Sequence, residues 1–135
     1  MSDSTLICNS PSLLNKQGYS EVPDGVAPIY IVEVSLDGGL EMSGGQAIFS
    51  YYREPIVTHA SPSLGPLKAG TIVKLHGSGF TQATAAGGRK LVRLGHVHVE
   101  PTSVTNDTIT FEAPPVLFPS TTVIGVSLNG QQFTG

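Results

Sequence analysis

Short runs of alternating apolar and polar residues recur along the chain, and Gly, Pro, Asn or Ser separates each run from the next. In residues 71–76, Val73 and Leu75 alternate with Lys74 and His76, a pattern that predicts a strand with one buried and one solvated face. No segment shows sustained helical periodicity with capping residues. The pattern therefore predicts an all-β protein.

Four further segments show the same alternation, and their apolar residues are predicted to line the core: Val92 and Leu94; Val97 and Val99; Ile109 and Phe111; Ile124, Val126 and Leu128. Six prolines lie between the runs, where no strand needs their missing N–H donor: Pro62, Pro66, Pro101, Pro114, Pro115 and Pro119. Strands this short, separated by turn residues, are typical of a sandwich of two sheets.

Two parts of the chain resemble each other. Residues 5–11 align with residues 108–114, and residues 31–38 align with residues 123–130. Because residues 55–106 have no counterpart upstream, the repeat predicts the last part of one domain followed by one nearly complete domain. The predicted domains are residues 1–54 and residues 55–135.

A glycine-rich turn follows the repeated strand in both domains. Residues 37–39 follow the strand predicted to end at Leu36, and residues 129–130 follow the one predicted to end at Leu128. Glycine accepts the positive φ that tight turns require. The first turn is predicted to open a long hairpin that closes with a strand at residues 47–52.

The two predicted domains differ in how they end. Residues 131–135 stop early in the strand that would be equivalent to residues 47–52. Residues 52–55 join the domains without a Gly/Ser stretch, which predicts a short and stiff junction.

Composition narrows the classes of partner. The net charge is −3, only 13% of residues are charged, and Lys and Arg form no cluster. Binding to nucleic acid or to anionic membranes usually needs a basic patch, so neither partner is expected. No apolar run is long enough to span a bilayer. The single cysteine, Cys8, rules out an intrachain disulfide.

Six segments resemble, in the same order, the IPT/TIG domain, an immunoglobulin-like β-sandwich shared by plexins and transcription factors: residues 55–62, 64–66, 69–80, 92–95, 109–114 and 126–130. Residues 5–52 are similar to the last three strands of a preceding copy, ending in the family's Phe-x-Tyr-Tyr pattern. The resemblance implies an all-β, immunoglobulin-like sandwich in tandem arrangement. Two residues depart from the family pattern. Ala60 stands where the family usually has a larger aliphatic residue, and Phe111 stands where many members have a cysteine.

The glycines of this pattern have a structural interpretation. Gly77 and Gly79 flank Ser78 where a strand leaves the sheet, and they are predicted to allow a backbone conformation or a close approach that a Cβ would block. Phe80 is then predicted to fill the end of the core. A phosphate-binding loop would need a helix after the glycines, and the sequence predicts none.

Histidines are the first candidates for a metal site. His96 and His98 are predicted to share the solvated face of one strand, with Glu100 as the nearest further ligand. Two ligands and one neighbour fall short of the three or four that such sites use. His59 and His76 are also predicted to face solvent. No metal or cofactor is therefore assigned.

Catalytic residues are equally hard to find. The chain has no Gly-x-Ser-x-Gly motif, and Glu100, Asp107 and Glu112 lie near predicted strand ends. Cys8 aligns with Phe111, a predicted core position, and is expected to be a buried small hydrophobe. Asn106 begins an N-glycosylation sequon in a predicted turn. The protein is not expected to be an enzyme.

The resemblance implies a non-catalytic structural and protein-interaction module, a fragment of a larger multidomain protein with tandem IPT/TIG domains that acts as a scaffold, spacer or adhesion element. Its partners would be other proteins or neighbouring domains of the same array. Leu6, Cys8, Val32, Val34 and Phe49 are predicted to pack against such a neighbour. Strand exchange between copies, in which residues 48–52 complete the second domain of another copy, is the alternative form of association.

A second hypothesis is an accessory or carbohydrate-contacting domain of a secreted polysaccharide-acting enzyme. Sugar-binding faces usually present exposed aromatic rings, and the chain has no Trp. Five aromatic residues are predicted to be core: Phe49, Tyr51, Phe80, Phe111 and Phe133. Tyr19, Tyr30 and Tyr52 remain for such a face. The compartment stays open, with an extracellular or cell-surface location slightly favoured.

Overall fold

The structure is a computed structural model of the 135-residue chain, and it describes residues 5–11, 29–82 and 88–135. Every regular element in these ranges is a strand, as predicted. The strands are β1 (Ile29–Val32), β2 (Ala47–Ser50), β3 (Ile56–Ser61), β4 (Ile72–Ser78), β5 (Leu91–Leu94), β6 (Val97–Val99), β7 (Ser103–Val104), β8 (Thr108–Glu112) and β9 (Ile124–Ser127).

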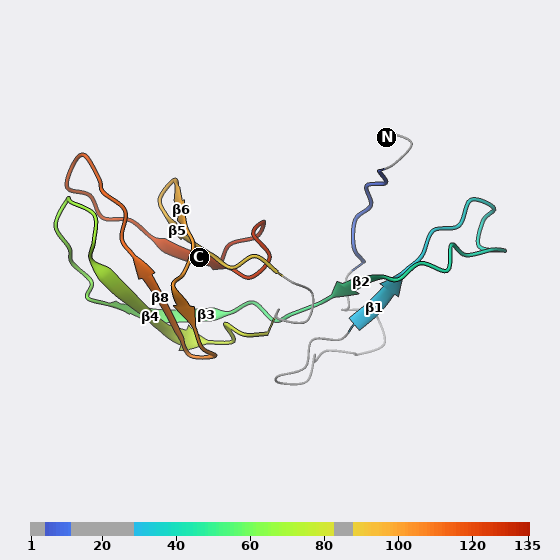
Figure 1. The fold of residues 1–135 in the computed structure, drawn as a ribbon, viewed down its shortest axis with the longest axis horizontal. Coiled ribbons are helices and arrows are strands. Elements are labelled where there is room, and N and C mark those ends of the chain that lie inside the picture. The colour runs from blue at the N-terminus through green and yellow to red at the C-terminus, as the bar shows by residue number, and fades with distance from the viewer. Residues whose placement is uncertain (1–4, 12–28, 83–87) are drawn as a thin grey trace.

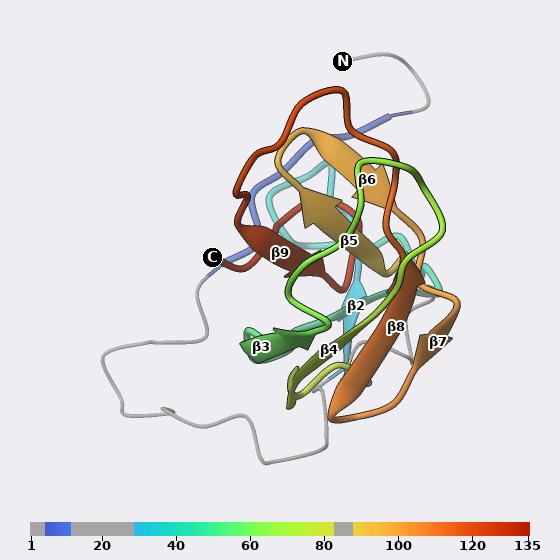
Figure 2. The same ribbon diagram turned by 90° about the vertical axis from the view of Figure 1, so that its left-hand side faces the viewer.

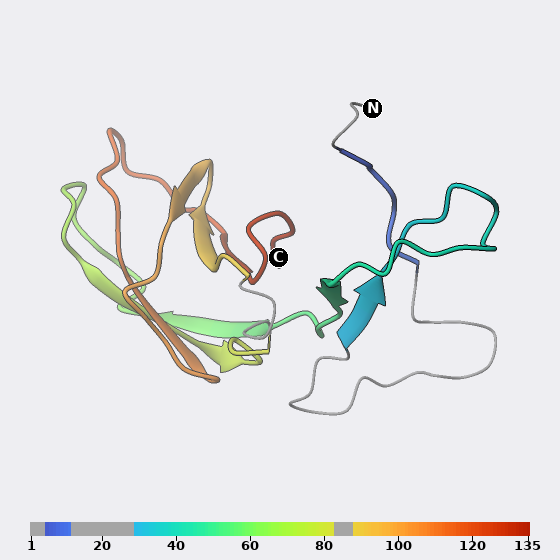
Figure 3. The same ribbon diagram turned by 45° about the vertical axis from the view of Figure 1, so that its right-hand side comes forward.

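The strands form three antiparallel sheets: β1-β2, β3-β4-β8-β7 and β6-β5-β9. Figure 2 shows the two larger sheets as two facing layers, the arrangement of an immunoglobulin-like sandwich. Figures 1 and 3 show β1 and β2 to one side of this sandwich, connected to it by the chain that runs from β2 to β3.

The core lies between the two larger sheets. Val73 pairs with Phe111 and Leu75 with Ile109 in one sheet, while Val92 pairs with Val126 in the other. The core cluster contains Val73, Leu75, Phe80, Val92, Ile109, Phe111, Val126 and Leu128, all at most 7% exposed. Burial of each such side chain stabilises the fold by about 1.5–3 kcal/mol. The alternation in the sequence correctly predicted these positions except Phe80, which the Gly-Ser-Gly-Phe pattern placed in the core.

The two glycines around Ser78 have the structural role predicted for them. A Cβ on Gly77 would lie within 1.9 Å of the Ile56 carbonyl oxygen, and Gly79 has a φ of +80°. Phe80 is fully buried and fills the core beside them. The Gly-x-Gly pattern therefore serves close packing and backbone conformation.

Several predicted elements differ in the structure. β1 ends at Val32 and β9 at Ser127, before Leu36 and Leu128. Residues 5–11 contain only an isolated bridge at Thr5, although the aligned residues 108–114 include β8. A strand persists only where a neighbouring strand satisfies its N–H and C=O groups, and β8 has β4 and β7 as partners.

Val97 was predicted to be core, but it is 43% exposed. It lies at the tip of the β5-β6 hairpin, directly after the exposed turn residues Gly95 and His96. Val99, which points to the same side two residues later, packs against the core as predicted. Alternation identifies the inward face but not where the facing sheet ends.

The junction between β2 and β3 is held by side-chain contacts. The backbone N–H of Arg53 donates to Oε1 of Gln82 at 3.1 Å, and Nε2 of Gln82 donates to the Gly79 carbonyl at 3.1 Å. Tyr52 packs against the core and Pro55 is buried. These contacts fix the connecting segment to the sandwich.

Candidate interaction surface

Two hairpins of the chain share one hydrogen-bond pattern. In the first hairpin, residues 34–43, the Ser43 N–H donates to the Val34 carbonyl at 2.9 Å and the Val34 N–H donates to Oγ of Ser43 at 3.1 Å. In the second hairpin, residues 126–134, the Thr134 N–H donates to the Val126 carbonyl and the Val126 N–H donates to Oγ1 of Thr134, both at 3.0 Å.

The turns inside the hairpins also match. Oγ of Ser35 donates to Oδ1 of Asp37 at 2.7 Å, as Oγ of Ser127 does to Oδ1 of Asn129 at 3.2 Å. Oδ1 of Asp37 also accepts from the backbone N–H groups of Leu40 and Glu41. In the second turn, Oδ1 of Asn129 accepts from those of Gln131 and Gln132. The following glycines, Gly38 and Gly130, have φ values of 77° and 76°, as tight turns require.

Asp37 differs from Asn129 in carrying a charge. The hydroxyl of Ser35 and the backbone N–H groups of Glu41 and Leu40 hold the pKa of the Asp37 carboxyl below its usual value. Hydrogen bonds to a carboxylate favour its ionised form. The first turn therefore keeps a negative charge where the second turn is neutral.

Equivalent apolar residues of the two regions have opposite environments. Leu36 is 96% exposed, whereas Leu128 is fully buried. Val34 is 38% exposed and Leu6 is 62% exposed, against 1% for Val126 and 0% for Ile109. The strands of residues 55–107 provide the cover in the second region, and no described residue provides it in the first.

Cys8 shows the same contrast and contradicts its prediction. The cysteine is exposed, while the aligned Phe111 is fully buried. Alignment with a core position predicts burial only if a second sheet lies opposite. Among residues 5–11, 29–82 and 88–135, no sheet lies opposite Cys8, and its side chain contacts solvent.

Apolar side chains of the first region are exposed on both faces of β1-β2, with Ile29, Ile31 and Ile48 on one of them. Seven others, called the open face from here on, are each at least 38% exposed: Leu6, Tyr30, Val32, Val34, Leu36, Met42 and Phe49. A groove of about 600 Å³ runs along part of it, with Leu6, Val34, Leu36 and Met42 as apolar lining and Asp37 and Glu41 as acidic lining. Exposed apolar patches of this kind often mark protein-interaction surfaces.

Aromatic residues pack beside the open face. Tyr51 makes edge-to-face contacts with Tyr30 and Phe49 at ring-centroid distances of 5.6 and 5.0 Å, and its hydroxyl donates to the Pro11 carbonyl at 2.6 Å. Phe49 is 43% exposed and Tyr51 is half-buried, so the prediction of core positions for both is wrong. Tyr52, predicted to be spare, packs against the core of the sandwich. Tyr19 lies outside the described residues.

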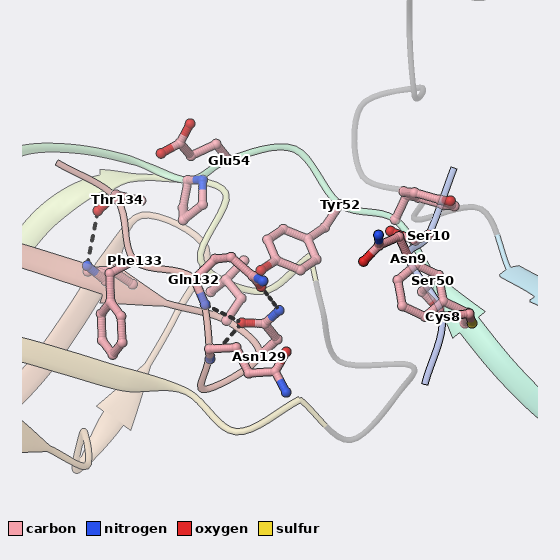
Figure 4. A pocket seen from close by; sticks show the side chains of 16 residues that line it. Cys8, Asn9, Ser10, Ser50, Tyr52, Glu54, Asn129, Gln132, Phe133 and Thr134 are labelled. Carbon is pink, nitrogen blue, oxygen red and sulfur yellow. Dashed lines mark hydrogen bonds between the residues drawn. The ribbon is translucent and has the colours of Figure 1, made fainter. Parts of the chain in front are cut away.

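A second cleft, of about 660 Å³, lies where the first region meets the sandwich. Figure 4 shows Cys8, Asn9 and Ser10 on one side, and Tyr52 extending toward Gln132 on the other. Partial burial and the nearby Glu54 carboxylate raise the pKa of Tyr52. The described lining of the cleft combines neutral polar groups and apolar side chains, and Glu54 is the charged residue in it.

The histidines make ring contacts. His98 stacks on Phe133 at 4.9 Å, and the Arg93 guanidinium lies 4.8 Å from the same ring. Phe133, predicted to be core, is therefore a half-buried residue of the outer face. His96 lies in the Gly95-His96 turn and not on the strand of His98, so the two do not form the predicted pair.

His59 and His76 stack on each other at 4.5 Å across β3 and β4. Within the described residues, no group of three or more His, Cys, Asp or Glu side chains is arranged to hold a metal ion. The prediction of no assigned metal residue stays a prediction.

The remaining candidate residues have local structural contacts. Arg89 and Glu100 form an ion pair in which Nη2 of Arg89 donates to Oε1 of Glu100 at 2.5 Å, and Oδ1 of Asp107 accepts from the Thr105 hydroxyl at 2.8 Å. Glu112 is the last residue of β8. Asn106 lies in the bend between β7 and β8, and its side chain accepts from the Thr81 hydroxyl at 3.1 Å.

The sequence of the sandwich matches a known family. The family model described as the IPT/TIG domain covers residues 55–135. The chain belongs to the IPT/TIG family. IPT/TIG domains are non-catalytic immunoglobulin-like modules that commonly occur in multidomain proteins and generally mediate protein interactions. A search among curated proteins found no match, and no helix among the described residues is long and apolar enough to span a membrane.

Proposed function

We propose that the protein is a non-enzymatic structural and protein-interaction module within a larger multidomain protein, with two IPT/TIG-like domains in tandem. Residues 1–54 are the C-terminal part of the first domain, and residues 55–135 are the nearly complete second domain. The single observation that carries the proposal is the shared hydrogen-bond pattern of the two hairpins, combined with the exposure of Leu36 and the burial of Leu128.

The interaction surface is the open face. An exposed apolar sheet with unpaired edges favours association, because burial removes apolar area from water and pairs backbone groups. The rigid junction supports a scaffold or spacer role, since Gln82 fixes the segment that connects the open face to the sandwich. Edge-to-face packing of Tyr30, Phe49 and Tyr51 offers no flat aromatic platform, so a protein partner is favoured over a carbohydrate.

Sedimentation equilibrium combined with limited proteolysis of the 135-residue chain tests this proposal. The expected result is rapid cleavage within residues 29–52 of the monomer, while residues 55–135 resist. A concentration-dependent dimer that protects residues 47–52 would instead indicate strand exchange between copies. A monodisperse monomer that unfolds in one transition, with residues 1–52 protected, would contradict the half-domain interpretation.

A further inference from the structure

One side chain of the sandwich, that of Arg89, has no counterpart among the described residues of the first region. Arg89 lies against the turn of the second hairpin, where a Cβ on Gly130 would be 3.5 Å from the Arg89 Cβ and 3.6 Å from its carbonyl oxygen. The equivalent Gly38 has the same φ, but a Cβ there would meet no described atom within 4 Å. The space that Arg89 occupies beside the second turn is therefore open beside the first.

The open space has an acidic lining. Asp37 and Glu41 line the groove next to Gly38, while the residues that take their place in the second hairpin are uncharged. All three hydrogen bonds to the Asp37 carboxylate reach Oδ1. Oδ2 remains available to a basic side chain, and a charge-assisted bond there would be stronger than a neutral one.

The segment that covers the second hairpin and the segment that carries the open face differ in net charge. Residues 55–107, the half that covers the second hairpin, contain five Lys or Arg and two Asp or Glu. Residues 29–52 contain three Asp or Glu and no Lys or Arg. Of these basic residues, Arg89 lies beside the turn of the second hairpin, whereas Arg93 lies over the Phe133 ring on the outer face. The charge complementarity to the open face therefore rests on a residue at the Arg89 position and on Asp37.

We propose that the open face binds the N-terminal half of an IPT/TIG-like sandwich, supplied by the larger protein, and that this half places a basic side chain, equivalent to Arg89, against the Asp37-Gly38 turn. The inference rests on the proposed function and adds the chemistry of the partner. The apolar lining accepts the inner face of the incoming sheet. The acidic turn selects for a basic residue at the end of that sheet.

An extended chain tests the proposal. A copy of residues 55–107 is joined directly to Thr5. Thr5 aligns with Thr108, so residue 107 of the copy is followed by Thr5 just as Asp107 is followed by Thr108 in the sandwich. The copy adds no cysteine, so maleimide reacts at Cys8, which lines the same cleft as Phe49 of the open face and reports on whether that edge of the face is covered. If the copy covers Cys8, labelling slows by at least about tenfold, since a covered state must open before it reacts.

Charge variants of the added copy test the basic contact at the Asp37-Gly38 turn separately from coverage of the open face. R89E is introduced into a copy that also carries E100Q, because Arg89 pairs with Glu100 within the sandwich. It is expected to raise the Cys8 labelling rate about two- to fivefold, the range expected for a partly exposed ion pair. D37R in the first turn should reverse that increase. K68E in the copy is the matched control, because Lys68 lies in the β3–β4 loop, away from the Arg89 turn, and follows Leu67, whose carbonyl accepts from the Val116 N–H.

The outcomes distinguish the inference from the function on which it rests. If the unmodified copy leaves Cys8 as reactive as in the 135-residue chain, both the half-domain function and the inference are wrong. If the copy protects Cys8 but R89E and K68E have equal effects, the half-domain function stands and the basic contact at Asp37 is wrong. Protection that R89E weakens and D37R restores supports both.

Discussion

The first and second hairpins have the same backbone hydrogen bonds and opposite environments. Val34 and Val126 are each held by a hydroxyl residue of the opposite arm, at distances between 2.9 and 3.1 Å. Val34 is 38% exposed and Val126 only 1%. Local sequence therefore determines the turn and its bonds, whereas burial depends on a second sheet that local sequence cannot provide.

The second sheet is the source of most of the stability. β4 and β8 contribute Val73, Leu75, Ile109 and Phe111 to the core that covers Val126. No strand in the described part of the chain covers the small β1-β2 sheet, and a two-stranded hairpin alone is marginally stable in water. Residues 55–135 are accordingly expected to account for the cooperative unfolding of the chain.

The largest expected difference between the two regions is at a pair of aligned positions. Phe111→Ala should lower the free energy of unfolding by about 3–5 kcal/mol, because it removes a fully buried ring from the core. Cys8→Ala should change it by less than about 0.5 kcal/mol, since Cys8 is exposed. Urea denaturation followed by circular dichroism measures both.

Equal losses for Phe111→Ala and Cys8→Ala would break the comparison, because they would place Cys8 in a packed core. If Phe111→Ala is too unstable to study, Ile109→Val provides a milder change, with an expected loss of about 0.5–1.5 kcal/mol. Ile109 is fully buried, and its aligned residue Leu6 is 62% exposed. Leu6→Val is its matched control.

The junction offers a smaller and more local test. Gln82→Ala removes the acceptor for the Arg53 N–H and the donor to the Gly79 carbonyl, and should cost about 1 kcal/mol. It should also speed proteolytic cleavage at residues 52–55. Gln131→Ala, an exposed glutamine in the second turn, is the control. Unchanged cleavage in Gln82→Ala would mean that other contacts hold the junction.

The smallest expected effect concerns the outer face of the second hairpin. His98→Ala removes the ring stacked on Phe133 and should cost about 0.5–1 kcal/mol. His96→Ala, in the exposed turn, should cost less than about 0.5 kcal/mol. The first hairpin has Met42, 57% exposed, where the second has Phe133. Equal effects of the two histidine variants would show that the stack adds nothing to the hairpin.

Much of the sandwich could be predicted because its signals are local. The alternation around Val73 and Leu75 identifies a strand with one buried face, and the turn glycines identify positions of positive φ. The role of Gly77 followed from its place at the end of a strand, although only the structure shows the approach of the Ile56 carbonyl. Such features depend on residues close in sequence.

The errors concern contacts between distant segments. Cys8 was predicted to be buried because it aligns with Phe111, but burial requires an opposing sheet. Phe133 lies outside any strand, so no alternation could show that it joins Arg93 and His98 on the outer face. The position of Arg89 beside Gly130 also links residues about 40 apart in sequence, and only the fold brings them together.

Amide hydrogen exchange of Ser43 and Thr134 in the 135-residue chain tests the central claim most directly. Each N–H donates to the carbonyl of the equivalent valine, at 2.9 and 3.0 Å, so the bonds themselves are matched. Thr134 is expected to exchange only through opening of the sandwich, whereas Ser43 is expected to exchange with little protection because no described sheet covers its hairpin. Equal and strong protection of both amides in the monomer would contradict the claim that the first hairpin belongs to an uncovered half-domain.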